Sequence, residues 1–312
     1  MTYDVIIVGG ASAGLTAAIY SARRALKTLV LSKDVGGQAA YATIIENYPG
    51  FESVPGPELM LKFKAQAEKA GAEFKMAEVT KIEKKENIFS VTTSVGEFSA
   101  KALILSFGLE HRRLNIPGEK ELTGRGVTYC ATCDGPLFKN KTVGIVGGGN
   151  SAFDAAEYLS GICTKVYLFV RTDQYRAEQV LIDKVKAAAN VEIMDFSELK
   201  QLTGEKKLEK ATVLNVKTGA EKELELNGLF IEIGYTPQTD LVKDLVQLDA
   251  KGQVVIDRDA KTNVPGVFAA GDITDASYKQ VVISAGEGAK AALSANRYLK
   301  SLTGAQDIPD WK

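Results

Sequence analysis

Apolar and polar positions follow the same order in two separate stretches of the chain. The first stretch has an apolar run at 4–8, the loop "GGASAG" at 9–14, a helical pattern over 15–25 and an apolar run at 28–31. Short apolar runs predict buried strands, and apolar positions three and four residues apart predict a helix. The order strand, glycine loop, helix, strand indicates a βαβ unit.

The second stretch repeats this order. It predicts a strand over 141–146, the loop "GGGNSA" at 147–152, a helix over 153–160 and a strand over 165–170. Two such units in one chain predict an α/β fold with two Rossmann-like, three-layer nucleotide-binding domains.

Each unit is followed by a segment of alternating apolar and polar positions. Residues 72–108 predict an antiparallel meander that leads into a buried strand at 102–105. Residues 191–234 have a similar pattern, so we expect the same β insertion in both domains.

The last part of the chain contains no third unit of this kind. After "GVFAAGDITD" at 266–275 comes a helical pattern over 282–298. We infer that this tail completes the first domain, in which the second is inserted. The predicted domains are 1–114 with 245–312, and 115–244, with crossings near 114–118 and 240–246.

The two glycine loops are candidates for binding the pyrophosphate of a dinucleotide. The first glycine of such a loop makes a tight turn, the second lets the backbone approach the pyrophosphate, and the third lets helix and strand pack closely. Gly147, Gly149 and Ala152 fit this pattern, whereas the first loop has Ala11 at its middle position. Either loop could also be a tight turn of an α/β fold that binds nothing.

A third glycine turn, "FAAGDI" at 268–273, places an acid after an apolar run. Gly271 and Asp272 form a turn in which a carboxylate can bind a ribose or ribityl hydroxyl. Gly-Asp turns are common, so this interpretation depends on the two loops that precede it.

Cys130 and Cys133 have the spacing of a redox dithiol or of half a zinc site. Zinc needs four ligands, and only Cys163 and His111 remain as further cysteine or histidine, so we predict no metal site. The alternatives left are two ordinary buried cysteines, or a dithiol in which one thiolate attacks and the other resolves. Asp134 is a candidate proton donor for such a dithiol. Cys163 is expected in the core.

Composition excludes other classes of function. The 312 residues are 45% hydrophobic and 25% charged, and the net charge is -1, so nothing indicates nucleic-acid or membrane-surface binding. No apolar run reaches the length of a membrane-spanning helix. The N-terminal "MTYDVIIVGG" enters the first strand without a leader pattern, and we therefore expect a cytoplasmic protein.

Five motifs together resemble those of the low-molecular-weight bacterial thioredoxin reductases, which are FAD-dependent pyridine nucleotide-disulfide oxidoreductases of class II. The motifs are "GGQ" at 36–38, "ENYPGF" at 46–51, "YCATCDG" at 129–135, "VGGGNSA" at 146–152 and "VPGVFAAGDI" at 264–273. The resemblance covers nearly the whole chain. It implies a homodimer whose outer domain binds FAD and whose inner domain binds NADPH and carries the disulfide. Its partner would be thioredoxin or a thioredoxin-like small redox protein.

The resemblance also implies roles for individual residues. Cys133 would be the thiol nearer the flavin, Cys130 the thiol that attacks the partner disulfide, and Asp134 the proton donor. The residues implied to bind FAD are Gly9, Ala11, Ser12, Ala13, Gly14, Gly37, Gln38, Asn47, Gly271, Asp272 and Gln280. Those implied to bind the pyridine nucleotide are Gly147, Gly149, Asn150, Ser151, Ala152, Arg171 and Arg176. One domain would swivel between a hydride-accepting and a dithiol-reducing pose.

The sequence departs from the family where the 2′-phosphate of NADPH would bind. In "VRTDQYR", Arg171 and Arg176 are kept, but Val170 and Thr172 replace two basic residues. A charge-assisted hydrogen bond is worth about 1.5–3 kcal/mol, so losing one would lower the affinity about tenfold or more. NADPH bound less tightly, NADH, and another donor such as reduced ferredoxin are all open as electron donors.

Three other functions share parts of this pattern. A flavoprotein that passes electrons to a peroxidase carries extra N-terminal thioredoxin-like domains, whereas this chain starts at the flavin strand, so we expect that function less. Ferredoxin–NADP reductases of the same shape lack the dithiol. A non-catalytic nucleotide-binding redox sensor is the alternative of another class, and a colourless protein unable to bind FAD would refute the enzyme hypothesis.

Overall fold

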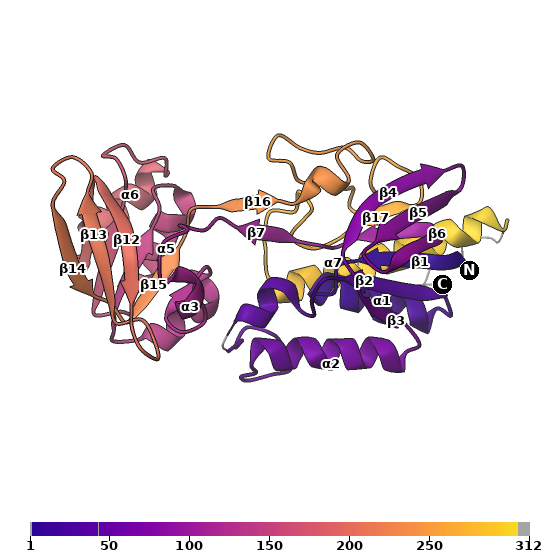
Figure 1. Cartoon of the computed structure of the whole chain (residues 1–312), viewed down its shortest axis with the longest axis horizontal. Coiled ribbons are helices and arrows are strands. Elements are labelled where there is room, and N and C mark those ends of the chain that lie inside the picture. The colour runs from indigo at the N-terminus through magenta and orange to yellow at the C-terminus, as the bar shows by residue number, and fades with distance from the viewer. Residues whose placement is uncertain (1, 43, 305–312) are drawn as a thin grey trace. The chain divides into compact units, whose positions relative to one another are not determined.

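The computed structural model describes residues 2–42 and 44–304, which form two compact units. Unit 1 comprises the described residues of Met1–Ala40, Tyr48–Glu110 and Pro237–Lys312, and unit 2 comprises those of Tyr41–Asn47 and His111–Thr236. Each unit contains a parallel sheet with helices packed against it (Figure 1). The predicted α/β class with two such sheets is confirmed.

Unit 1 is built around the first βαβ unit. Its first elements are β1 (Thr2–Val8), α1 (Ser12–Arg23), β2 (Thr28–Ser32), η1 (Gly37–Tyr41), α2 (Gly56–Lys69) and β3 (Glu73–Met76). β1 lies inside the sheet with parallel neighbours on both sides, as its continuous apolar run predicts. The helix begins at Ser12, inside the glycine-loop stretch 9–14 and three residues earlier than predicted.

The antiparallel strands of unit 1 continue its parallel sheet. They are β4 (Val79–Lys85), β5 (Ile88–Thr93) and β6 (Gly96–Leu105). β6 pairs antiparallel with β5 over 96–100 and parallel with β1 over 99–105. The meander predicted over 72–108 is wrong at its start, because β3 instead pairs parallel with β2. The tail adds β17 (Val267–Ala269) beside β6, and α7 (Val281–Leu302) packs against α1.

Unit 2 repeats the parallel arrangement with the strand order β11-β10-β9-β15-β8. Its elements are α3 (Glu119–Leu122), β8 (Val127–Thr128), α4 (Ala131–Asp134), η2 (Gly135–Phe138), β9 (Thr142–Val146), α5 (Asn150–Ser160), β10 (Lys165–Phe169), α6 (Gln179–Ala187), β11 (Val191–Met194) and β15 (Gly228–Ile231). The core between this sheet and its helices is aliphatic and aromatic, with Phe153 and Phe230 fully buried.

The second antiparallel insertion differs from the first. β12 (Ser197–Thr203), β13 (Lys210–Asn215) and β14 (Glu221–Glu225) form a sheet of their own. The ends of the segment predicted over 191–234, β11 and β15, belong to the parallel sheet. The expectation of one identical insertion in both domains is therefore wrong, because only in unit 1 does the last antiparallel strand run on into the parallel sheet.

Two short strands lie where the chain passes between the units. β7 (Leu109–His111) pairs with β16 (Tyr235–Pro237), and η3 (Thr239–Leu241) follows. Apart from the segment Tyr41–Asn47, which belongs to unit 2, the chain changes unit at 110/111 and again at 236/237. The predicted crossings near 114–118 and 240–246 therefore lie inside unit 2 and unit 1. Within the described residues, no helix combines the length and apolar character needed to cross a membrane.

Candidate functional site

The first glycine loop of unit 1 needs its glycines for steric reasons. Gly9 has φ +114°, and a Cβ on it would lie 2.4 Å from the carbonyl oxygen of Ser106. A Cβ on Gly14 would lie 1.9 Å from the carbonyl oxygen of Gly9. A side chain at either position would clash with these backbone atoms, so α1 could not pack as closely against the loop.

The start of α1 has the features of a dinucleotide site. Its N-cap is Ala11, which supplies no side-chain cap, so amide groups of the first turn are available to a phosphate. Ser12 and Ala13 are buried. The methyl group of Ala11 does not block the loop, because it projects towards Gly37, whose Cβ would lie 3.3 Å from it.

The turn at Gly271 and Asp272 lies against this helix start. A Cβ on Gly271 would be 2.9 Å from the Cβ of Ala13. The Ser284 hydroxyl donates a hydrogen bond to Asp272 Oδ1 at 3.0 Å, and the Gly271 amide donates to Glu287 Oε2 at 2.7 Å. Burial raises the pKa of Asp272, and the Ser284 hydroxyl and the Lys279 charge lower it. None of the five motifs quoted above includes Ser284 or Glu287.

Three further residues implied to bind FAD lie in unit 1, and a fourth does not. The Gly37 amide donates to Asp34 Oδ1 at 3.0 Å, and the Gln38 side-chain amide donates to the Leu109 carbonyl, both within unit 1. Gln280 is the N-cap residue of α7 in the same unit. Asn47, in contrast, belongs to the segment Tyr41–Asn47, which packs with unit 2.

The second glycine loop, in unit 2, has the same close packing as the first loop, except that space remains around Gly149. Gly147 has φ +151°, and a Cβ on it would lie 2.4 Å from the Glu232 carbonyl oxygen and 2.7 Å from the Cβ of Ala152. Ala152 is fully buried. A Cβ on Gly149 would meet nothing within 4 Å, and Gly149 caps α5 without a side-chain hydrogen bond. This open backbone is the position at which a pyrophosphate would approach.

The segment expected to bind the 2′-phosphate folds back onto this loop. The Arg176 amide donates to the Gly148 carbonyl at 2.7 Å, and the Glu178 amide donates to Asn150 Oδ1 at 2.7 Å. The positions implied to face the nucleotide, Ser151, Arg171 and Arg176, are exposed.

The two replaced basic positions have different surroundings. Val170 is 5% exposed and belongs to the core of unit 2. Thr172 is exposed, and its hydroxyl donates to the Gln174 carbonyl at 3.1 Å. Only Thr172 therefore occupies a surface position from which a longer basic side chain could extend.

Cys130 and Cys133 form a disulfide with their Cα atoms 5.3 Å apart. Cys130 is the N-cap of α4, and its sulfur accepts a hydrogen bond from the Cys133 amide at 3.2 Å. Both cysteines are partly exposed, whereas Cys163 is free and buried, as predicted. Among residues 2–42 and 44–304, no group of three His, Cys, Asp or Glu side chains could hold a metal ion.

Asp134 lies directly after the disulfide and has two unlike carboxyl oxygens. Oδ2 accepts a hydrogen bond from the Thr128 hydroxyl. Oδ1 is buried and has no hydrogen-bond partner among the described residues. Burial raises the pKa of Asp134, and the Thr128 hydroxyl lowers it. A carboxyl group of this kind holds a proton more readily than an exposed one.

A second acid, Glu232, lies next to the disulfide and is not predicted by any motif. Its Oε1 atom accepts a hydrogen bond from the amide of Ala131, between the two cysteines, at 3.4 Å. The pKa of Glu232 is raised to about 7: burial is the main cause, the Ala131 amide lowers the pKa, and the charge of Asp154 adds to the rise. The one feature of the sequence that could have indicated a role for Glu232 is its position directly after the buried strand at 228–231.

The strand order of unit 2 brings these features together. β15 lies between β8 and β9, all three are parallel, and Phe230 pairs with Thr128 while Ile231 pairs with Val146. The carboxyl ends of the three strands are therefore neighbours at one edge of the sheet. The disulfide segment, Glu232 and the loop 147–152 follow these ends in that order. Ligands of doubly wound sheets bind outside this edge.

The only histidine in the sequence, His111, packs against two tyrosines. Its ring centroid is 4.8 Å from that of Tyr129 and 4.7 Å from that of Tyr235. Burial, assisted by the Arg113 charge, lowers the pKa of His111 to about 4, so the ring is neutral at physiological pH. We therefore assign His111 to packing beside the disulfide segment rather than to proton transfer.

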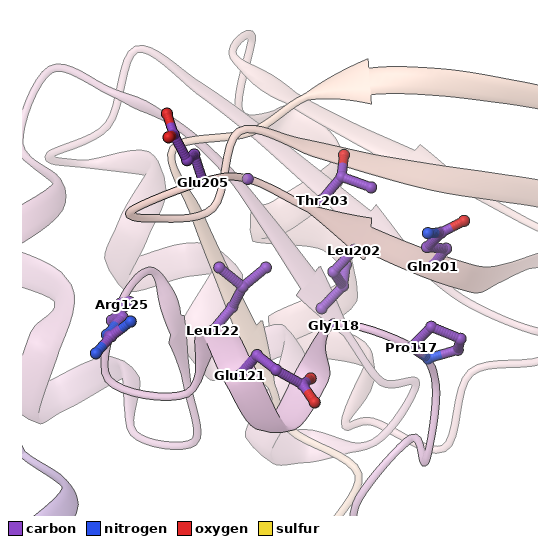
Figure 2. A pocket seen from close by; sticks show the side chains of 10 residues that line it. Pro117, Gly118, Glu121, Leu122, Arg125, Gln201, Leu202, Thr203 and Glu205 are labelled. Carbon is purple, nitrogen blue, oxygen red and sulfur yellow. The ribbon is translucent and has the colours of Figure 1, made fainter.

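Unit 2 also has a cavity of about 490 Å³ that is lined by other residues (Figure 2). It opens between α3 and the β12 hairpin, where Glu121, Arg125 and Glu205 are among its lining residues. None of the residues implied to bind a cofactor lines it. The chemistry of the disulfide and of the glycine loops therefore identifies the candidate site, and this cavity does not.

Comparisons with known proteins agree with this arrangement. The profile of the family described as "Pyridine nucleotide-disulphide oxidoreductase" matches residues 3–288. A thioredoxin reductase of Treponema pallidum is 41% identical over 302 residues, which cover 96% of this chain and 98% of the relative. The crystal structure of thioredoxin reductase from Streptococcus pyogenes has a TM-score of 0.91 at 37% identity and covers 96% of this chain and 99% of that chain.

A relative with a different name also matches. One of the proteins of the alkyl hydroperoxide reductase of Staphylococcus aureus is 40% identical over 299 residues, which cover 95% of this chain. The match covers 59% of that relative's own length. The similarity to this chain is thus confined to part of that protein.

Proposed function

The chain belongs to the pyridine nucleotide-disulphide oxidoreductase family, and from this premise we propose that it is a thioredoxin-disulfide reductase. It is a flavoprotein disulfide reductase, in which electrons from a reduced donor reach a protein disulfide through the flavin and the Cys130–Cys133 pair. Within the proposal, the flavin is FAD, the donor is NADPH and the substrate is thioredoxin or a thioredoxin-like protein. The proposal also includes a homodimer in the cytoplasm.

The observation that carries the proposal is the disulfide at the same sheet edge as a dinucleotide loop. β8 leads into Cys130 and β9 leads into Gly147, and only β15 separates the two strands. The same domain would therefore carry the dithiol and bind the donor. Neither a structural disulfide nor a simple nucleotide-binding protein needs this combination.

Unit 1 fits FAD. The uncapped start of α1 would hold the pyrophosphate, and the glycines before it leave room for close approach. Asp272, held by Ser284, would accept a hydrogen bond from a ribityl or ribose hydroxyl. When bound, FAD supplies two-electron chemistry that connects a hydride donor with a disulfide.

NADPH is the proposed donor, and the alternatives are NADH and a one-electron donor such as reduced ferredoxin. The open backbone at Gly149 and the uncapped start of α5 favour a pyridine nucleotide. The exposed Arg171 and Arg176 favour a 2′-phosphate. The loss of two basic residues from the same segment lowers the expected affinity.

A hydrogen bond between the cysteines supports the roles proposed for them. The Cys133 amide points at Cys130 Sγ and would stabilise a thiolate there, which favours Cys130 as the attacking sulfur. The Cys130 thiolate would attack the partner disulfide, and one partner thiolate would leave and take up a proton. The Cys133 thiolate would then attack Cys130, re-form the internal disulfide and release the second partner thiolate. Asp134 would hold and transfer the proton.

An anaerobic titration of the purified protein tests this function. NADPH, NADH and reduced ferredoxin are added separately while the flavin absorbance is followed, and thioredoxin reduction is then measured with each donor. We expect bleaching by NADPH and NADPH-dependent reduction of thioredoxin. C130S and C133S should keep flavin reduction and lose thioredoxin reduction. A protein without bound flavin, or a C130S variant with full activity, would refute the proposal.

A second candidate function is transfer of electrons to a peroxidase. It is favoured by the 40% identity to a protein of alkyl hydroperoxide reductase. The same assay distinguishes the two functions if a peroxidase replaces thioredoxin as the acceptor. Faster reduction of the peroxidase than of thioredoxin would favour this candidate.

The proposal includes a change in the orientation of the two units during turnover, which the family resemblance implies. The support within this chain is the separate folding of the units and their short connecting strands, β7 and β16. A chemical crosslink that fixes the units should stop turnover and leave the flavin bound. Turnover at the original rate in the crosslinked protein would refute this part of the proposal.

A further inference from the structure

We propose that the charge on Glu232 controls pyridine-nucleotide binding at the loop 147–152, where the neutral acid permits binding and the carboxylate opposes it. The inference rests on the proposed function, because it takes this loop as the nucleotide site. It adds a residue that controls nucleotide affinity and that lies outside the five motifs of the sequence.

Glu232 contacts both the disulfide segment and the nucleotide loop. It is the first residue after β15, whose two neighbours lead into Cys130 and Gly147. Its carboxylate accepts a hydrogen bond from the Ala131 amide at 3.4 Å. Its carbonyl oxygen is so near Gly147 that a Cβ there would lie 2.4 Å away. The side chain of Glu232 therefore contacts the disulfide segment, and its backbone lies against the nucleotide loop.

The position of Glu232 places its charge near the path of the nucleotide. In a doubly wound sheet the ligand crosses the edge where the chain connections diverge, which in unit 2 is between β9 and β15. The nucleotide's pyrophosphate is anionic, and like charges repel strongly in a site that excludes water. Protonation of Glu232 removes this repulsion and makes the carboxyl group a hydrogen-bond donor.

The groups around Glu232 favour its neutral form. From α5, the Asp154 carboxylate adds negative charge and raises the pKa of Glu232, whereas the Ala131 amide of α4 lowers it. The other acid of α4, Asp134, is turned to the Thr128 hydroxyl of β8. The glycine loop after β9 adds no titratable side chain next to Glu232. With burial as the largest cause, the pKa of Glu232 is about 7.

This arrangement links nucleotide binding to proton uptake. Above neutral pH, Glu232 is ionised before the nucleotide binds, and a nucleotide that requires the neutral form must bind together with a proton. The affinity then falls as the pH rises, by up to about tenfold for each pH unit above the pKa of the free protein.

Titration calorimetry of the oxidised holoenzyme between pH 6.5 and 8.5 tests the inference. The probes are NADP+ and NAD+, neither of which reduces the flavin. NAD+ lacks the 2′-phosphate, a group that itself titrates near pH 6. For wild type we expect weaker binding of both probes as the pH rises, with proton uptake visible as a dependence of the heat on the buffer.

Three variants complete the experiment. E232Q and E232A should bind both nucleotides with little pH dependence, and at pH 8.5 they should bind about tenfold or more tightly than wild type. E121Q removes an exposed glutamate of α3 in the same unit and should follow wild type at every pH. Flavin absorbance and the thermal midpoint at pH 6.5 check that each variant is folded.

The outcomes separate this inference from the proposed function. Binding by E232Q and E232A alone, with none by wild type, would support the inference. Equal affinity and equal pH dependence in wild type and the Glu232 variants would overturn it and leave the proposed function intact. If no variant binds either nucleotide but a chemically reduced flavin still passes electrons to thioredoxin, the inference and the NADPH assignment both fail, and the disulfide reductase stands.

Discussion

The Thr128 hydroxyl donates a hydrogen bond to one oxygen of Asp134, while the other oxygen of Asp134 is buried without a partner among the described residues. The hydroxyl orients the carboxyl group and stabilises its charged form, whereas burial favours the protonated form. The two effects oppose each other, so the pKa of Asp134 is raised, but less than burial alone would raise it.

Replacement of Asp134 should impair proton transfer at the dithiol. General acid–base catalysis typically contributes about 10²–10⁴-fold, so D134N should lower thioredoxin reduction by about 10²-fold or more. Reduction of the flavin by dithionite should be unchanged, since it does not involve the dithiol. Stopped-flow measurement of the two steps separates them, and a D134N variant within twofold of wild type in both would contradict the assigned role.

Removal of the Thr128 hydroxyl should change the pH dependence instead. T128V loses the hydrogen bond that stabilises the Asp134 carboxylate, so the pKa of Asp134 rises further. A step that needs protonated Asp134 slows as the pH rises through this pKa, and in T128V the fall should begin at higher pH. The pH–rate profile of thioredoxin reduction measures this shift. An unshifted profile in T128V would show that the proton transferred at the dithiol does not come from Asp134.

The third cysteine, Cys163, should be unreactive in the folded protein. Burial raises the pKa of Cys163 to about 11, and its Sγ atom donates to the Phe138 carbonyl at 3.3 Å. In the folded, reduced protein at pH 8, an alkylating reagent should therefore modify Cys130 and Cys133 and add a third label only after denaturation. Mass spectrometry counts the labels. C163A should keep full activity and lose about 1 kcal/mol of stability.

The two glycine loops offer a matched pair of substitutions. A Cβ at Gly14 would lie 1.9 Å from the Gly9 carbonyl oxygen, whereas a Cβ at Gly149 would meet nothing within 4 Å among the described residues. G14A should therefore lose flavin and melt at lower temperature. G149A should fold with its flavin and bind nucleotide about tenfold or more weakly, because the methyl group occupies the pyrophosphate approach. Flavin absorbance and calorimetry distinguish these outcomes, and an unchanged nucleotide affinity in G149A would argue against a ligand at this loop.

The repeated elements could be predicted because their signals are local. A glycine loop between an apolar run and a helix is a property of consecutive residues, and both loops have the expected geometry. The spacing of Cys130 and Cys133 is local as well, and the two form the disulfide. The arrangement of the antiparallel strands could not be predicted in the same way. The last antiparallel strand of unit 1, β6, continues into the parallel sheet, whereas β14 of unit 2 stays in a separate sheet.

The placements that the motifs do not predict are those that long-range packing determines. Glu232 follows the disulfide by about a hundred residues in sequence and reaches it only because β15 pairs with β8. The motifs group Asn47 with the flavin loops, yet its segment packs with unit 2. The family resemblance presents Val170 as the replacement of a basic residue at the 2′-phosphate site, and in the structure it is part of the core. None of these placements is encoded in adjacent residues.

The exposed Thr172 provides a test of the donor. T172R would place a cation beside Arg171 and Arg176 at the predicted 2′-phosphate position, and one charge-assisted hydrogen bond corresponds to about tenfold or more in affinity. We expect T172R to bind NADPH more tightly and to leave NADH unchanged. The matched variant V170R should instead destabilise the protein, because it buries an unpaired charge in the core. Equal effects of T172R on NADPH and NADH would exclude this segment as the 2′-phosphate site.

Glu232 should also make the stability of the protein pH-dependent. Its pKa is raised from 4.5 to about 7 in the native state, so between these values the native state binds a proton that the unfolded state has lost. Stability must then decrease as the pH rises from 4.5 through about 7, by at most about 3 kcal/mol. E232Q lacks this titration, so its stability should decrease less over the same range. Thermal midpoints of wild type and E232Q from pH 5 to pH 8 measure the difference, with E121Q expected to follow wild type. Parallel curves for wild type and E232Q would mean that Glu232 titrates at its ordinary pKa in the folded protein.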